Sequence, residues 1–186
     1  MLRGDMQAAA HIIDEIVPLI REERFLFPLQ VLGPLTSILS FNIHSYASAK
    51  DDGKRKEVLK KTLSVLKQVR KYGPKFIFRY PEALRLAGTF YWLTGKQGAA
   101  RKCWKEGLAI AGKLGLKPEL GRISFEVAKR LTGPESRQKS LSNLGISHYV
   151  KTAREIFTEI GLDVDLKELE DWEHETATRA HGAETI

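Results

Sequence analysis

The sequence predicts an all-α fold, a stack of about three helical hairpins with an extra helix at each end. The first observation is periodicity, because apolar residues recur three or four positions apart, a spacing that places side chains on one helix face. The second is the glycine and proline residues that separate these segments at short intervals. The third is the alternation of small and large residues from Leu84 to Leu108, which allows two helices to approach closely.

The N-terminal part is expected to contain two helices. Residues 5–23 show an amphipathic pattern, with Asp5 as the N-cap and Pro18 either kinking the helix or beginning a new one. Residues 25–49 contain no Asp, Glu, Lys or Arg, which raises the alternative of a membrane span. We favour a buried helix from about Pro34 to Ala49, because prolines, a glycine and polar side chains interrupt the apolar run.

Residues 55–72 predict a helix with two contrasting faces. One face is apolar, and the other carries a set of lysines: Lys56, Lys60, Lys67 and Lys71. Such a face can contact nucleic-acid phosphates or an acidic membrane surface. The alternatives are a solvated helix face, which is the default, and contact with the acidic end of the chain. Gly73 and Pro74 stand where glycine and proline usually follow a helix.

The segment from Leu84 to Leu108 predicts two helices folded back on each other. Gly88 and Tyr91 share a face of the first helix, and Ala100 and Trp104 share a face of the second. Glycine inside a helix costs roughly 1 kcal/mol relative to alanine. We therefore expect Gly88 to face the partner helix near Ala100 and Trp104. The pair resembles a tetratricopeptide (TPR) repeat, a helix pair with small and aromatic residues at matched positions.

The remaining segments continue the helical pattern at irregular intervals. After the clearest repeat, residues 81–114, a helix is expected from Pro118 to about Leu131. Residues 132–145 form a polar loop, which we expect to be a mobile insertion. Ser147 to Ile160 is the last clear repeat helix, and a short helix after it completes a single domain over 1–170. Residues 171–186 are expected to be a polar, frayed tail.

Three stretches carry a narrower resemblance: YPEALRLAGTFYWLTGKQGAARKCWKEGL, KPELGRISFEVAKRL and KTAREIFTEIGLDVDLKELE. Together they are similar to the C-terminal repeat region of large bacterial signalling proteins. Those proteins carry a class III adenylate/guanylate cyclase or protein kinase domain, then a predicted ATPase domain, then helical repeats. The resemblance implies a TPR-like α–α superhelix, a solenoid that acts as a regulatory or scaffold segment. It does not transfer catalytic activity, because the catalytic motifs of such proteins would lie upstream of this segment.

No motif for catalysis or metal binding is complete. Gly95 and Lys96 give the nearest approach to a phosphate-binding loop, without the earlier glycine or the hydroxyl residue. His174 begins an H-E-x-x-H pattern, but Thr178 stands in place of the second histidine. Cys103 has basic neighbours that would favour a thiolate, although an ordinary cysteine is the preferred interpretation. We therefore expect no catalytic residue, no metal and no cofactor.

Composition constrains location and partners. The chain has 186 residues and a net charge of +7, with basic residues concentrated in the middle and acidic residues at the end. These regions could meet each other or recruit different partners. One cysteine allows no intramolecular disulfide, and the N-terminus lacks the apolar run of a signal peptide, so we expect a cytoplasmic protein. No membrane span and no specific nucleic acid are expected, and self-association remains open.

The first functional hypothesis is a non-catalytic module that binds a protein segment or small effector on a concave face. Arg85, Thr89 and Trp92 form one stripe at i, i+4 and i+7, and Phe125 and Lys129 would continue it in the next pair. Arginine and tryptophan are common among binding hot spots. For Trp92 the alternative is packing in the core.

The second hypothesis is a nucleic-acid-associated regulator that uses the basic middle region as a phosphate contact. A third, weaker hypothesis is an enzyme of unrecognised type. A steep loss of nucleic-acid binding with added salt would favour the second hypothesis over the first.

Overall fold

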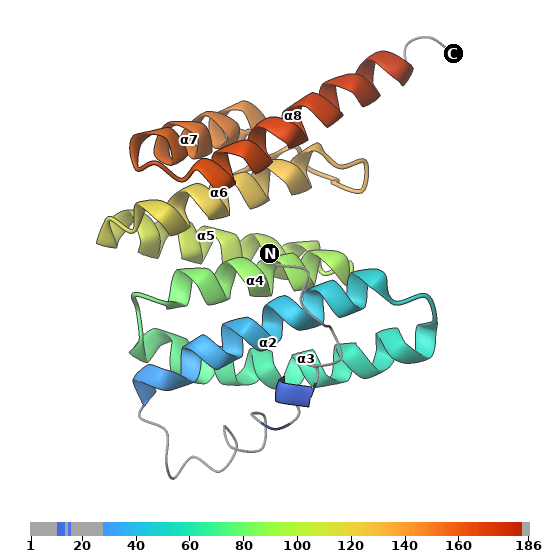
Figure 1. The fold of residues 1–186 in the computed structure, drawn as a ribbon, viewed down its shortest axis with the longest axis vertical. Helices are drawn as coiled ribbons and strands as arrows, with labels where there is room; N and C mark the ends of the chain where they lie inside the picture. The colour runs from blue at the N-terminus through green and yellow to red at the C-terminus, as the bar shows by residue number, and fades with distance from the viewer. Residues whose placement is uncertain (1–10, 14, 16–27, 184–186) are drawn as a thin grey trace. The chain divides into compact units, whose positions relative to one another are not determined.

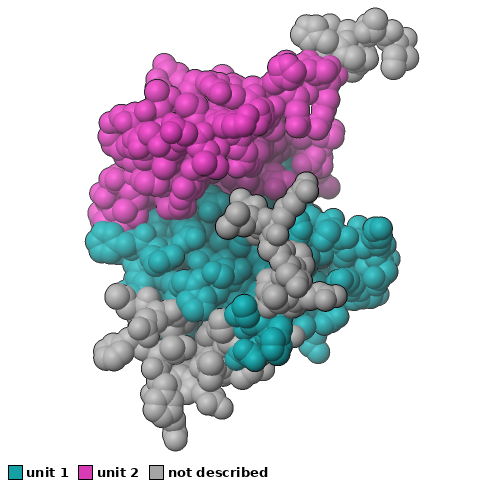
Figure 2. Space-filling view, viewed as in Figure 1, with its two compact units in different colours: residues 1–103 teal, residues 104–186 magenta. Residues whose placement is uncertain are grey.

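The computed structural model of the chain describes residues 11–13, 15 and 28–183 (Figure 1). The helix predicted over 5–23 therefore lies almost entirely outside the described residues. What is described is helical apart from a two-stranded hairpin, which confirms the all-α prediction. The chain divides into two compact units, residues 1–103 and 104–186 (Figure 2), where the sequence predicts one domain over 1–170.

Among its described residues, unit 1 contains three complete α-helices: α2 (Pro28–Ser48), α3 (Asp52–Tyr72) and α4 (Tyr80–Leu93). Helix α2 packs against both α3 and α4 (Figure 1). It begins at Pro28 rather than near Pro34, which lies inside the helix, and its buried leucines support the predicted core role. In the part of the chain that the structure describes, none of the helices is apolar over a length sufficient to cross a membrane.

Helix α3 has the two faces that its sequence predicts. The carboxylate of Asp51 caps its first turn by accepting a hydrogen bond from the backbone N–H of Lys54 at 2.7 Å. The core face consists of five buried residues: Val58, Thr62, Val65, Leu66 and Val69. The hydroxyl of Thr62 donates to the carbonyl of Val58 at 2.7 Å, so this buried polar group is satisfied.

Unit 2 begins inside α5 (Gln97–Leu114), since the boundary between the units falls between Cys103 and Trp104. It continues with the following elements: α6 (Lys117–Thr132), β1 (Ser140–Leu141), β2 (Leu144–Gly145), α7 (Ile146–Glu159) and α8 (Asp163–Ala183). Helix α7 packs against both α6 and α8 (Figure 1).

Aromatic side chains form the centre of unit 2. The ring of Phe125 on α6 makes edge-to-face contacts with Phe157 of α7 and Trp172 of α8, at centroid distances of 6.5 and 5.7 Å. A Cβ added at Gly121 would lie 2.7 Å from Cε1 of Phe157, so the missing side chain is what allows α6 and α7 to approach. Gly88, for which the sequence predicts the same role, is buried on α4.

One type of turn occurs three times along the chain. Helices α4, α5 and α7 are each followed by a glycine with positive φ: Gly95 (76°), Gly115 (65°) and Gly161 (66°). In each case the N–H of the next residue bonds back five positions, at 2.8, 2.9 and 2.9 Å. This is the Schellman arrangement, in which glycine adopts the left-handed conformation at no steric cost. The repeated turn links each of these helices to the next within a few residues.

The polar loop predicted over 132–145 contains a hairpin. Ser142 and Asn143 have φ angles of 52° and 63°, which is the conformation of a type I′ turn between β1 and β2. The hydroxyl of buried Tyr149 donates to the carbonyl of Leu141 at 2.8 Å, which ties the hairpin to α7. A Ser-Asn turn lacks the glycine that usually signals this turn type, so the sequence pattern did not indicate it.

The predicted polar tail requires a correction. Helix α8 continues to Ala183, so residues 171–183 are helical rather than frayed. Trp172 anchors the middle of the helix on Phe125, and Glu175 and Arg179 form an i, i+4 ion pair at 3.2 Å. Alanine, glutamate and arginine are strong helix formers, which extends the helix beyond its packed part. Residues 184–186 lie outside the described part.

Candidate functional site

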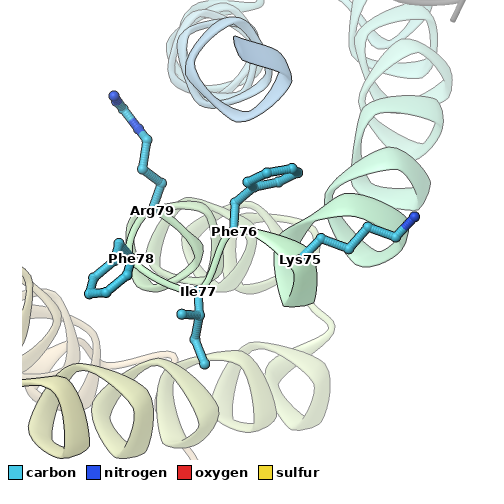
Figure 3. Close-up of a pocket in the computed structure, with 5 residues that line it drawn as sticks. All are labelled: Lys75, Phe76, Ile77, Phe78 and Arg79. Carbon is cyan, nitrogen blue, oxygen red and sulfur yellow. The ribbon is translucent and has the colours of Figure 1, made fainter. Parts of the chain in front are cut away.

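The connection between α3 and α4 exposes two adjacent large apolar side chains. Ile77 is 40% exposed and Phe78 is 68% exposed, and the cations Lys75 and Arg79 stand on either side of them. We call residues Lys75, Phe76, Ile77, Phe78 and Arg79 the linker site (Figure 3). Single exposed apolar residues are ordinary on protein surfaces, but adjacent ones flanked by charge are typical of interaction surfaces.

Hydrogen-bonded turns give the linker a defined shape. After α3 ends at Tyr72, residues Gly73–Lys75 form a 3₁₀ turn, and the N–H of Phe76 donates to the carbonyl of Gly73 at 2.9 Å. The carbonyl of Phe76 then accepts from the N–H groups of Arg79 and Tyr80, at 3.0 and 3.1 Å. The second turn leads directly into α4, so Ile77 and Phe78 stand at the tip of a hydrogen-bonded loop.

The ring of Tyr80 lies so close to the backbone at the base of this loop that position 73 requires a glycine. A Cβ at this position would lie 2.1 Å from Cδ2 of Tyr80, whose side chain is 2% exposed. The φ of Gly73 is −51°, so the residue does not act as the left-handed cap that usually ends a helix. The ring of Tyr80 instead occupies the space where a side chain would be, and this packing closes the loop.

The side chains of the linker site leave the backbone in two directions. Phe76 and Arg79 extend to one side in Figure 3, and Ile77 and Phe78 extend to the other. A pocket of about 270 Å³ is lined by all five residues. Pockets that hold drug-sized ligands have volumes of roughly 300–1,000 Å³, so this one is better suited to a single side chain of a partner.

A row of lysines on α3 leads to the linker site. We call Lys56, Lys60, Lys67 and Lys71 the lysine stripe, which covers about 22 Å of the helix at 1.5 Å per residue. All four are exposed and lie at i, i+4, i+11 and i+15, on the face opposite the buried residues of α3. Within the part of the chain that the structure describes, Lys56, Lys60 and Lys67 have no acidic partner.

An aromatic ring connects the stripe to the linker site. The ammonium groups of Lys71 and Lys75 lie 4.9 and 5.9 Å from the ring centroid of Tyr72, within the range of cation–π attraction. At the other end of the linker, Arg79 pairs with Glu82 at 3.2 Å. An exposed i, i+3 pair of this kind contributes little energy, and a guanidinium has five N–H donors, so Arg79 can still bind a partner.

Several basic side chains of α6 are arranged differently, because acidic side chains of α7 and α8 pair with them. Arg122 donates to both carboxylate oxygens of Asp165, at 2.9 and 3.0 Å, and these hydrogen bonds raise the pKa of Arg122. Lys129 pairs with Glu168 at 3.0 Å. Part of the basic middle region therefore meets the acidic end of the chain, one of the alternatives that the charge distribution left open.

The stripe predicted as a contact surface on α4 is mostly buried. Thr89 is buried, and its hydroxyl donates to the carbonyl of Arg85 at 3.1 Å, while Arg85 itself is half-buried. Trp92 is 4% exposed, and the guanidinium of Arg101 lies 5.8 Å from its ring centroid. This burial favours the core alternative for Trp92 and leaves little of the stripe for a partner to contact.

The residues predicted to continue that stripe on α6 have internal contacts as well. Phe125 is buried in the core of unit 2. The ammonium of Lys129 lies 4.2 Å from the ring centroid of Phe125 and pairs with Glu126 and Glu168. Helix α4 belongs to unit 1 and α6 to unit 2.

Other candidates from the sequence show no reactive arrangement. Cys103 is fully buried, which fits the preferred interpretation of an ordinary cysteine, and a guanidinium nitrogen of Arg70 lies 3.5 Å from its sulfur. Across the described residues, no group of three or more His, Cys, Asp and Glu side chains is placed to hold a metal ion.

Sequence reasoning missed the linker site although a signal was present. The run from Lys75 to Arg79 places three apolar residues between two cations, directly after Gly73 and Pro74. A short apolar run outside a helix has no helix face on which to be buried, so such a run indicates a candidate for an exposed contact.

Comparison of the chain with protein-family models, curated proteins and solved structures finds no match in any of the three.

Proposed function

We propose that the chain is a non-catalytic interaction module that binds a segment of another protein at the linker site. The observation that carries this proposal is the adjacent exposure of Ile77 and Phe78 on a hydrogen-bonded loop between two cations. Aromatic residues and arginine are enriched in protein–protein interfaces relative to the rest of the surface. A loop that is already ordered also loses less conformational entropy when it binds.

The size of the pocket supports a protein segment over a small effector. Its volume of about 270 Å³ is below that of ordinary small-molecule sites, and it is formed by one short stretch of chain. A protein segment can insert one side chain into such a recess while its backbone and other side chains contact the surrounding surface.

A TPR-like arrangement is the architecture we propose for the module. The three identical glycine turns after α4, α5 and α7 support it, because they connect helices in the short, regular manner of helical repeats. On the basis of the resemblance of residues 80–170, the biological role would be a regulatory or scaffold segment of a cytoplasmic bacterial signalling protein.

A nucleic-acid-associated regulator is the second candidate. It is favoured by one observation, the three lysines of the lysine stripe that lack acidic partners among the described residues. The sequence of the lysine-bearing helix shows no base-reading motif, so we expect at most weak, non-specific binding of duplex DNA at physiological salt. Sub-micromolar, sequence-selective binding at that salt would favour this candidate over the first.

Selection from a library of displayed random peptides tests the proposal. The folded chain is the bait, and the selected peptides are then measured against the double variant Ile77→Ser/Phe78→Ser. The matched control is Val164→Ser, because Val164 is an 81% exposed apolar residue on α8 in unit 2. We expect peptides that bind the parent and the control but lose at least tenfold in affinity for the double variant. Selected peptides that bind all three proteins equally would contradict the proposal.

A further inference from the structure

We propose that the segment recognised by the linker site is an acidic amphipathic helix that presents a large apolar side chain next to carboxylates about one turn away. This inference rests on the proposed function and names the chemistry of the partner. It follows from the charge around the linker site and from helix α8, an acidic helix whose side chains contact α6 within unit 2.

Positively charged residues flank the apolar residues of the linker site in the sequence. Lys75 and Arg79 flank Ile77 and Phe78, and Lys71 approaches through the ring of Tyr72. Within the described residues, Lys75 has no acidic partner, and Arg79 has only the exposed pair with Glu82. A partner with carboxylates around an apolar residue would complement this arrangement, whereas a basic partner would be repelled.

Unit 2 provides an internal precedent for such recognition. Phe125 and Lys129 stand one turn apart on α6, with the ammonium of Lys129 4.2 Å from the ring centroid of Phe125. On α8, Glu168 and Trp172 are also one turn apart. Glu168 pairs with Lys129 at 3.0 Å, and Trp172 makes an edge-to-face contact with Phe125 at 5.7 Å.

This precedent defines a simple rule of recognition. A surface with a cation next to an aromatic ring takes a helix with a carboxylate next to a large apolar side chain. In unit 2 the rule is satisfied within the chain. In unit 1 the linker site has the same kinds of side chain close together in the sequence, with Phe78 between Lys75 and Arg79, and Phe78 is 68% exposed.

An anionic membrane is the principal alternative to a helical partner, because exposed apolar residues beside lysine and arginine also bind bilayers. Two features favour a helix. The recess at the linker site has room for one side chain, a feature that a bilayer surface does not use. In addition, Phe76 projects to the opposite side of the loop from Ile77 and Phe78, so the three apolar side chains do not form one insertable face (Figure 3).

The probe for the test is a fluorescent synthetic peptide with the sequence of residues 163–183. It has seven acidic and two basic side chains, and it forms the helix α8 in the structure. Its control carries Gln in place of Glu168, Glu170 and Glu173 and Asn in place of Asp171. Fluorescence anisotropy measures binding of both peptides to the full chain.

Three variants of the chain assign the binding to a surface. Lys75→Gln/Arg79→Gln and Ile77→Ser/Phe78→Ser change exposed residues of the linker site, and Val164→Ser is the matched control. We expect the acidic peptide to bind the parent and the control, and each linker variant to weaken it at least tenfold. The amide control peptide should bind the parent at least tenfold more weakly, and added salt should weaken the acidic peptide.

Several outcomes would overturn the inference. If the linker variants bind the acidic peptide as tightly as the parent does, the peptide binds elsewhere, for example to unit 2 in place of α8. Equal binding of the amide control would show that carboxylates are not recognised. Linker-dependent binding to phosphatidylserine vesicles or duplex DNA, without binding to the peptide, would identify a membrane or a nucleic acid instead. If displayed peptides depend on the linker site but are not acidic, this inference fails while the proposed function stands.

Discussion

Replacing Gly73 by alanine should destabilise unit 1, because the side chain of Tyr80 occupies the space that a Cβ would need. The added atom would lie 2.1 Å from Cδ2 and 2.2 Å from Cε2 of Tyr80, whereas ordinary van der Waals contact is 3.4–4 Å. The ring is 2% exposed, so it cannot move into solvent without disturbing its neighbours. The loop that presents Ile77 and Phe78 depends on this packing.

The expected magnitude combines two opposing effects. Forcing an extra carbon into a packed site typically costs about 1–3 kcal/mol. The φ of −51° at Gly73 is accessible to alanine, so restriction of the unfolded chain returns about 0.4–1 kcal/mol. The net loss of unfolding free energy should therefore be on the order of 1–2 kcal/mol.

Urea denaturation followed by circular dichroism measures this loss. The matched control is Gly112→Ala on α5, where a Cβ would meet nothing within 4 Å and the helix should gain about 0.4–1 kcal/mol. The two variants should therefore move the transition midpoint in opposite directions. A Gly73→Ala variant as stable as the parent, with the control behaving as expected, would refute the described packing of the linker.

Four further predictions concern other contacts. Trp92→Ala should cost roughly 3–5 kcal/mol in a denaturant melt, since the side chain is 4% exposed, and a loss below about 1 kcal/mol would return Trp92 to the candidate contact residues. Tyr149→Phe should cost roughly 0.5–1.5 kcal/mol and speed hydrogen exchange in the hairpin, because the carbonyl of Leu141 loses the hydrogen bond from the hydroxyl; unchanged exchange would contradict this. Burial also raises the pKa of Tyr149, so the parent should lose stability as the pH rises above about 10, and Tyr149→Phe should lose less. Arg122→Met should destabilise unit 2 by about 1 kcal/mol at low salt and by less at high salt, since its bidentate bond to Asp165 is partly exposed; a loss independent of salt would contradict an ionic contribution.

The helices could be predicted because their signals are local. In α3, apolar side chains at helical spacing predict a helix over residues 55–72, and the structure places it at Asp52–Tyr72. The end of α8 was missed, because composition alone does not distinguish a polar tail from an exposed helix. That helix is held by Trp172 on Phe125, a contact between residues far apart in the sequence.

The candidate site was harder to predict, because exposure depends on the whole fold. The stripe of Arg85, Thr89 and Trp92 has the spacing of a helix face, but spacing does not reveal whether that face meets solvent or a neighbouring helix. Thr89 and Trp92 are buried in the structure. The apolar residues of the linker site remain exposed, because the turns between α3 and α4 hold Ile77 and Phe78 at the tip of the loop.

The lysine stripe could be predicted from the sequence only in part. Its four residues could be assigned to one exposed face from their spacing, and all four are exposed on α3. The sequence did not show that Lys71 and Lys75 would both approach the ring of Tyr72 and so connect the stripe to the linker site. That connection depends on the 3₁₀ turn at Gly73–Lys75, whose sequence indicates only the end of a helix.

Mapping amide chemical shifts on a bound peptide tests the central claim most directly. A peptide obtained by selection against the folded chain is titrated into the isotope-labelled protein, and the shifted backbone amides are assigned. If the peptide binds at the linker site, the chemical-shift changes should be concentrated at residues 75–80, with smaller changes at Lys67 and Lys71. Shifts centred on α4 from Arg85 to Trp92, with the linker amides unchanged, would contradict it and restore the concave-face prediction.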